Sequence, residues 1–406
     1  MLPSLNFSKK DPKFTLLNKV FKYVDNKNAM RIYGRNGIKN IPMMVISIKI
    51  IFTAFYFDYP VSKVIEELNR DNRLKKFLNI DGEVPEVSQV YEYISRYSSD
   101  KFVNIVNSLL KTCNKHNRSR YKQYIGDSTG VECDINIAKE FISPERLEKL
   151  KLEWGYSTTK GHFIGFKVTI VLDEKTLCPV AILIHPGGPN DSKIFDQILK
   201  ELKRRRIIKP KDIILFDKGY YSYNNYNLGI NKYKVICIIF PKSNFDIKKL
   251  EQKMSYPLDA FKKKKKIKEN KSLYKNLKAI LLKKIENWKK YKPIRGKIED
   301  FFKVTKEAFG LDKIHKYTKQ SATKHIYLTI LLTTIVIQEG YTTKTTMQQL
   351  AEGNIELKPL KKTKTNIKKN KTKITQKPPV PQESQQKLPS HKEKEPQTTL
   401  QMFQKI

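Results

Sequence analysis

The sequence predicts an α/β protein in which helices flank a mixed sheet, with an all-helical region before the sheet and a disordered basic tail after it. Residues 1–115 carry apolar side chains at helical spacing. Residues from about 120 to 240 contain the alternating or short continuous apolar runs that are typical of strands. Residues 355–406 are rich in Lys, Thr, Gln and Pro and show no hydrophobic periodicity.

The first region, residues 1–115, is expected to form a helical, DNA-binding domain. Apolar residues recur at helical spacing in "VSKVIEELNRDNRLKKFL" (61–78), and a second helix is expected in "PEVSQVYEYISRY" (85–97), where Pro85 suits a first helical position. Two helices joined by the turn-forming "NIDGEVP" are compatible with a helix-turn-helix DNA reader. Plain helix packing is an equally common reason for the same pattern.

The second region, residues 116–345, contains five predicted strands. The first three are "RYKQYIGD", followed by an expected turn at "STG", then "HFIGFKVTIVLD" and "PVAILIHPG". A helix capped by Asn190 comes next, and the short apolar runs "DIILFD" and "YKVICIIF" supply two more strands. A lysine-rich helical insertion at 250–290 and an apolar helix at 326–337 complete it.

This order of elements matches a ribonuclease H-like sheet. Three strands that can pair as an antiparallel meander are followed by strands joined through helical crossovers. In that arrangement the fourth strand lies beside the first. The ends of these two strands would therefore be neighbours.

The charge of the chain points to a polyanionic partner. Lys and Arg total 80 against 40 for Asp and Glu, a formal net charge of +40 that favours binding to nucleic acid or an anionic surface. The longest apolar runs are too short, or are interrupted by Lys49, to cross a bilayer, so no membrane association is expected. The four scattered cysteines indicate reduced thiols. We expect a cytoplasmic, nucleoid-associated protein.

Two carboxylates follow strands that the sheet would place side by side. Asp127 ends the first predicted strand in "YIGDSTGVE", and Asp217 ends the fourth in "IILFDKGYYS". Oxygen ligands of this kind bind Mg²⁺ or Mn²⁺, and two such ions can activate the attacking oxygen and stabilise the leaving oxygen in phosphoryl transfer. Each aspartate alone more commonly caps a turn. Asp191 is a weaker rival ligand.

A third carboxylate is expected from the helix in "YKPIRGKIEDFFKVTK" (291–306). At about 100° per residue, Arg295, Glu299, Phe302 and Lys306 fall on one narrow stripe, whereas Asp300 points about 100° away from Glu299. Pro293 is expected to open the helix just after Tyr291. The alternative is an ordinary surface pair between Arg295 and Glu299.

The chain resembles prokaryotic insertion-sequence transposases of the DDE class, in the subgroup marked by Tyr-x2-Arg-x3-Glu-x6-Lys. The spacing of Arg295, Glu299 and Lys306 matches this signature, and Tyr291 lies one residue too far from Arg295. "GDSTG", "KGHFIGFKV" and "FDKGYYS" resemble the other family motifs, in order, over roughly residues 40–340. The resemblance implies that Asp127, Asp217 and Glu299 bind two divalent metal ions. It also implies that Arg295, Lys306 and Tyr291 hold DNA phosphates at the transposon ends.

The last residues, "QTTLQMFQKI", contain a second motif. Gln397, Leu400 and Phe403 fit the Q-x-x-L-x-x-F pattern, which resembles the peptide that partners of the DNA sliding clamp (PCNA) carry. The usual second aromatic residue is replaced by Gln404. A functional motif of this kind would point to an archaeal host, whereas a chance match in a Gln-rich tail is the alternative.

These observations predict a DDE transposase that hydrolyses DNA at transposon ends and joins the freed 3′-hydroxyl to target DNA. A homodimer in the synaptic complex is expected. Two alternatives stay open: a ribonuclease H-like nuclease or resolvase without strand transfer, and a domesticated transposase that only binds DNA.

Overall fold

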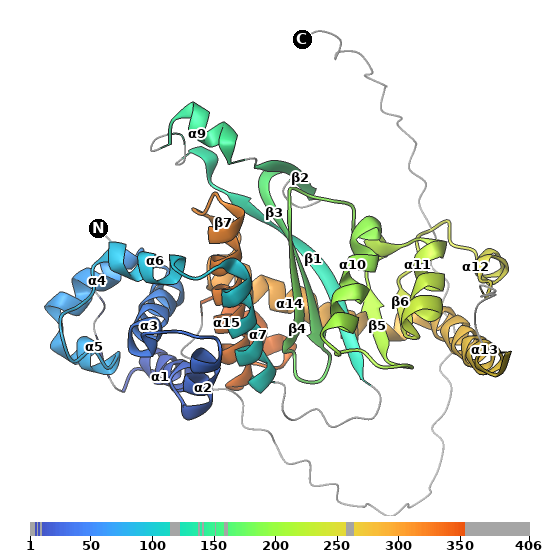
Figure 1. Ribbon diagram of the computed structural model, residues 1–406, viewed down its shortest axis with the longest axis horizontal. Coiled ribbons are helices and arrows are strands. Elements are labelled where there is room, and N and C mark those ends of the chain that lie inside the picture. Colours follow the sequence, from blue (N-terminus) through green and yellow to red (C-terminus); the bar gives the residue numbers. More distant parts are fainter. Residues whose placement is uncertain are drawn as a thin grey trace, which may run out of the picture. The chain divides into compact units, whose positions relative to one another are not determined.

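The computed structural model describes residues 5, 7–8, 10–113, 122–136, 139, 142–150, 152–157, 161–256 and 264–353. The chain up to Leu360 forms one compact unit, and Figure 1 shows its sheet beside a group of helices. Gln397, Leu400 and Phe403 lie outside the described residues, as does the rest of the chain after residue 353.

The N-terminal region is helical, as predicted. Its helices are α1 (Pro12–Val24), α2 (Lys27–Arg35), α3 (Ile41–Phe57), α4 (Val61–Arg70), α5 (Asn72–Phe77), α6 (Val87–Ser95) and α7 (Ser99–Cys113). They pack on α15 (Lys319–Gln338), the predicted apolar helix, which contacts α1, α3 and α7 and is almost entirely buried. The division into two domains at about residue 115 stays a prediction, because helices from both sides share one hydrophobic core.

The sheet is mixed and ribonuclease H-like, which confirms the predicted fold class (Figure 1). Its main strands are β1 (Gln123–Cys133), β3 (Gly161–Asp173), β4 (Pro179–Pro186), β5 (Ile213–Phe216) and β6 (Ile236–Ile239). β1 pairs antiparallel with β3, and β3 pairs antiparallel with β4. β1 also pairs parallel with β5, and β5 pairs parallel with β6. The first and fourth predicted strands are therefore neighbours.

Two further strands were not predicted, and one predicted turn was wrong. β1 runs straight through "STG", because Ser128, Thr129 and Gly130 pair with β3. β2 (Glu153–Ser157) pairs with the first half of β3, and β7 (Lys313–Ile314) pairs with the end of β1. The extension of β1 and the pairing of β7 depend on segments that are distant in sequence, which local turn propensity does not encode. β2 instead forms a hairpin with the neighbouring β3.

The remaining helices connect the strands and cover the sheet. They are α9 (Pro144–Lys149), α10 (Asp191–Arg204), α11 (Tyr223–Leu228), α12 (Ile247–Lys253), α13 (Lys264–Glu286), α14 (Lys292–Lys303) and α16 (Lys344–Ala351). Asn190 caps α10, as predicted, by accepting a hydrogen bond from the Ser192 N–H. α14 contacts β1, and α13 contacts β6. The predicted helical insertion at 250–290 corresponds to α12 and α13.

In the part of the chain that the structure describes, no single helix has the length and apolar composition needed to cross a membrane. The bent pair α3 and α4 reaches the required length only when the two helices are taken together. The angle between them is 106°.

Candidate active site

Asp127 and Asp217 lie at the same level of two adjacent strands. Asp217 directly follows β5, whereas Asp127 lies within β1, so the expectation that Asp127 ends its strand was wrong. The parallel pairing of β1 with β5 ends at Gly126 and Phe216, and the two aspartates are the next residues on each strand. A Cβ atom on Gly126 would lie 2.5 Å from the Phe216 ring, so only glycine permits this close approach of the strands. The prediction from strand order thus places both carboxylates at one edge of the sheet.

Glu299 is brought to the same edge by α14. Pro293 lies in the first turn of this helix, and Tyr291 directly precedes the helix, as predicted. Ile298 and Phe301 are fully buried and fix the rotation of the helix about its axis. Arg295 and Glu299, four residues apart, consequently lie on the face of α14 that meets β1.

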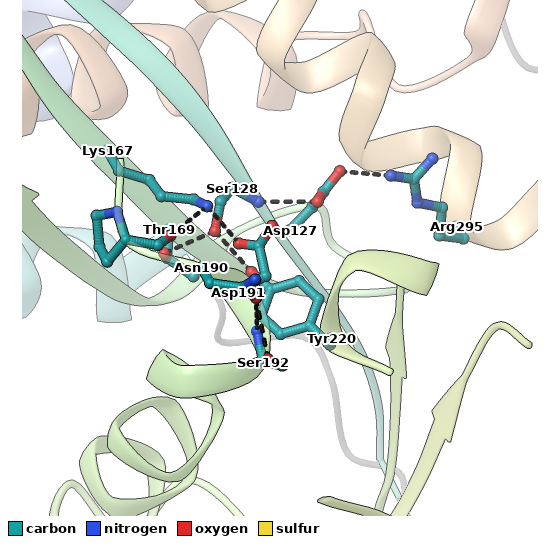
Figure 2. A network of polar contacts seen from close by, with 10 residues as sticks. Asp127, Ser128, Lys167, Thr169, Asn190, Asp191, Ser192, Tyr220 and Arg295 are labelled. Atoms are coloured by element: carbon teal, nitrogen blue, oxygen red, sulfur yellow. Dashed lines mark hydrogen bonds and ion pairs between the residues drawn. The ribbon is translucent and has the colours of Figure 1, made fainter. Parts of the chain in front are cut away.

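The Arg295 guanidinium joins the three carboxylates, and Figure 2 shows its contact with Asp127. Its Nη2 lies 2.6 Å from Asp127 Oδ2 and 3.8 Å from Asp217 Oδ1, and its Nη1 pairs with Glu299. The Arg295 side chain is 13% exposed, whereas that of Glu299 is 60% exposed. Arg295 and Glu299 do pair along the helix, but they do not form an isolated surface pair, because the arginine also contacts Asp127 on the sheet.

The electrostatics of Asp127 are dominated by burial. Desolvation raises the pKa of its carboxyl group to about 7, against the opposing effects of Arg295 and of the hydrogen bond from the Ser128 N–H. The negative charges of Asp217 and Asp191 raise this pKa further. The pKa of Arg295 is raised because its three carboxylate neighbours outweigh its own desolvation. The site thus concentrates negative charge that requires a cation.

The other two residues of the predicted stripe make different contacts. Phe302 packs in the hydrophobic core. Lys306 falls in a π-helical turn, η4 (Val304–Ala308), and pairs with Asp312 at 3.1 Å. Its expected role in binding DNA stays a prediction.

Tyr291 accepts a hydrogen bond from Lys284 at 2.9 Å and is half-buried. Asp300, which the helical spacing set apart from Glu299, makes no contact with Asp127 or Asp217 that the structure records. The described part of the chain therefore brings together Asp127, Asp217, Arg295 and Glu299, and leaves Tyr291 and Lys306 at the periphery.

The donor set suits hard divalent cations. Three carboxylates offer the oxygen ligands that Mg²⁺ and Mn²⁺ prefer, and they already surround one positive charge. No three His, Cys, Asp or Glu side chains of the described residues converge closely enough to hold an ion unaided. The guanidinium stands between them, and its Nε is buried without a hydrogen-bond partner among the described residues. The residues present fit the metal, provided that Arg295 moves away.

Residues that the sequence did not single out lie behind Asp127. Lys167, Thr169 and Tyr220 join Ser128 and Asp191 in a set of polar contacts (Figure 2). Asp191 had been considered only as a weaker rival ligand, and it pairs with Lys167 at 2.8 Å. The alternation of β3 could have indicated Lys167 and Thr169, because both are polar positions within an otherwise apolar strand.

Comparisons with known proteins identify the family of the chain. The family described as transposase DDE domain matches residues 121–336, which is more than half of the chain and includes all three carboxylates. No curated protein matches the chain. A solved structure described as a piggyBac transposase synaptic complex with hairpin DNA is similar at a TM-score of 0.39 and 12% identity, covering 85% of this chain and 81% of that one. The chain belongs to the transposase DDE family.

Proposed function

We propose that this transposase cleaves DNA at the ends of a mobile element and joins the freed 3′ ends to target DNA. The observation that supports this most strongly is the convergence of Asp127, Asp217 and Glu299 on one positive charge at the edge of a ribonuclease H-like sheet. In the first step, water attacks the phosphorus atom and the bond to the 3′ oxygen breaks. In the second step, that 3′-hydroxyl attacks a target phosphorus atom and displaces the target's own 3′ oxygen.

The three carboxylates are proposed to hold two Mg²⁺ or Mn²⁺ ions. When bound, the ions supply charge stabilisation for the attacking and leaving oxygens. Asp127 and Asp217 lie on adjacent strands, and Glu299 projects from α14 with most of its side chain exposed. Glu299 is therefore the ligand with the most freedom to adjust to the bound DNA.

Arg295, Lys306 and Tyr291 are proposed to bind DNA phosphates. The unpartnered Nε of Arg295 supports this for the arginine, because a buried N–H donor without an acceptor is costly. A phosphate that draws the guanidinium away from the carboxylates would satisfy it, since arginine binds phosphate through two parallel hydrogen bonds. Lys306 would have to exchange Asp312 for a phosphate.

The wider assembly is also a proposal. The net charge of +40 supports extensive contact with DNA, and the N-terminal helices are proposed to recognise the element ends. Two copies of the chain would hold the two ends together. Residues Gln397, Leu400 and Phe403 are proposed to bind a sliding clamp.

A strand-transfer assay with the element's own ends and Mg²⁺ tests the proposal. We expect cleavage and joining by the wild type, and loss of both steps with retained end binding in Asp127→Ala, Asp217→Ala and Glu299→Ala. Asp300→Ala is the matched control, since it removes the neighbouring acid of α14. Cleavage without joining would instead indicate a nuclease, and binding alone a domesticated protein. Wild-type activity in any of the three carboxylate variants would refute the assignment.

A further inference from the structure

A chain of polar side chains lies behind Asp127, on the opposite side of strand β1. Neighbouring residues of a strand point to opposite faces, so Asp127 faces Arg295 on α14 while Ser128 faces away from it. Ser128, Thr169, Tyr220, Asp191 and Lys167, here called the support network, come from β1, β3, the turn after β5 and the start of α10 (Figure 2).

The contacts within the support network are short and continuous. The Ser128 hydroxyl lies 2.8 Å from that of Thr169 and 2.6 Å from that of Tyr220. The carboxylate of Asp191 lies close enough to the Tyr220 hydroxyl to raise its pKa. Asp191 pairs at 2.8 Å with Lys167, which also donates to the Pro189 carbonyl at 2.7 Å.

The Asp191–Lys167 pair favours one direction for the hydrogen bonds. A carboxylate paired with a lysine only accepts, so a Tyr220 proton that points toward Asp191 is favoured. In that order the Tyr220 oxygen accepts from Ser128 and Ser128 accepts from Thr169, although either hydroxyl of each pair can donate. The pKa of Tyr220 agrees with this order: it is raised chiefly by burial, and the contact with Asp191 raises it whereas that with Ser128 lowers it.

The surroundings are built to keep this arrangement in place. Tyr220 and Thr169 are 0% exposed, so each hydroxyl would be costly to bury without its partners. A Cβ atom on Gly219 would lie 2.9 Å from Asp191 Oδ2, so glycine at this position leaves room for the carboxylate. Asp191 also lies in the first turn of α10, where the helix dipole favours a negative charge.

We propose that Tyr220 and Asp191 are positioning residues that hold Asp127 in place for metal binding. They act through Ser128: its hydroxyl is held by Tyr220, and its backbone N–H donates to Asp127 Oδ1 at 2.9 Å. This rests on the proposed function, in that Asp127 is the metal ligand. Groups that orient metal ligands commonly change metal affinity or activity by about 10- to 100-fold when removed.

Tyr220→Phe tests the proposal, with Tyr226→Phe as its matched control. Tyr226 is also a fully buried tyrosine, but its hydroxyl donates to the Ile239 carbonyl at 2.6 Å and has no link to Asp127. We expect Tyr220→Phe to weaken Mn²⁺ binding about tenfold by calorimetric titration and to lower kcat for end cleavage about as much, with an unchanged KM for DNA. Tyr226→Phe should leave both the affinity and kcat at wild-type values.

Ser128→Ala removes the last hydroxyl of the support network and keeps the backbone N–H. It should reproduce the effect of Tyr220→Phe, and Asp191→Asn should do the same. Thermal unfolding of each variant shows whether it is folded. Wild-type Mn²⁺ affinity in a folded Tyr220→Phe variant overturns the positioning role, as does an equal loss in Tyr226→Phe. If the wild type binds Mn²⁺ but does not cleave DNA, the proposed function fails while the titrations still decide the positioning role.

Discussion

Arg295 and a divalent ion compete for the same carboxylates, so removing the arginine should strengthen metal binding in the absence of DNA. The guanidinium lies 2.6 Å from Asp127 and 3.8 Å from Asp217. An ion can take its place only after these contacts are broken. Arg295→Gln removes the positive charge and keeps a polar side chain at this position of α14.

The expected gain follows from the ion pair with Asp127. Two unit charges about 4 Å apart attract by about 4 kcal/mol at an effective dielectric constant of about 20. Asp217 is more distant and Glu299 is largely exposed, so their pairs with Arg295 contribute little more. Rearrangement of water and side chains reduces the gain. If at least about 1.4 kcal/mol of this attraction is regained as free energy of metal binding, the variant binds Mn²⁺ at least about tenfold more tightly.

Calorimetric titration of DNA-free protein with Mn²⁺ at pH 8 measures this effect, because the wild-type Asp127 carboxyl, whose pKa is raised by burial to about 7, is then mostly ionised. Arg295 lowers this pKa, so its removal raises it, and release of the extra proton reduces the gain in the variant. Lys297→Gln is the control. It removes one positive charge from the same helix, but Lys297 pairs with Glu174 away from the three carboxylates. The control should bind Mn²⁺ like the wild type. Weaker or unchanged Mn²⁺ binding by Arg295→Gln would refute the competition and show that the arginine stays with Asp127 when metal is bound.

Three further predictions concern the core, the sheet and the C-terminus. Burial lowers the pKa of His325 to about 3, with smaller contributions from Lys316 and His315. The His325 ring packs edge-on against Phe55, with 4.7 Å between the ring centroids. At low pH the unfolded chain therefore binds a proton that the folded chain excludes, so the folded state becomes less stable as the pH drops below about 6.5. From pH 7.5 to pH 5.5 the free energy of unfolding should fall by about 1.4 kcal/mol. Urea unfolding of wild type and His325→Gln at both pH values measures it, and an equal pH dependence in the two proteins would contradict the assignment. Gly126→Ala should lower the free energy of unfolding by about 1–3 kcal/mol in the same assay, because Phe195 and Tyr220 pack against Phe216 and keep its ring from moving away from the new methyl group. A change within about 0.5 kcal/mol would show that the two strands can separate enough to hold a methyl group. A C-terminal peptide should bind the sliding clamp and lose binding when Leu400 and Phe403 are both alanine, and equal binding by the two peptides would remove the clamp motif.

The sequence was sufficient to predict the parts of the site that depend on strand order and local helical spacing. Asp127 lies within the first main strand and Asp217 follows the fourth, and the ribonuclease H-like order alone makes those strands neighbours. Arg295 and Glu299 are four residues apart within a regular helix, so they share a face. Pro293 and Asn190 act at the helix ends where local chemistry indicates.

Other parts could not be predicted, because they depend on contacts between distant segments. The support network joins residues from four separate stretches of sequence, and only Lys167 and Thr169, as polar positions in an apolar strand, carry a local sign of it. The π-turn that contains Lys306 and the pair of Lys306 with Asp312 were not predicted either. The bridging role of Arg295 was also out of reach, since the spacing to Glu299 does not reveal a contact with β1.

Metal stoichiometry in the protein–DNA complex tests most directly whether the three carboxylates form the catalytic centre. Electron paramagnetic resonance can count the Mn²⁺ ions bound per chain when the protein is assembled with DNA that carries the element ends. We predict two ions per wild-type chain and a loss of at least one in Asp217→Asn, with DNA binding retained. An unchanged number of bound ions in Asp217→Asn would contradict a metal centre built on Asp127, Asp217 and Glu299.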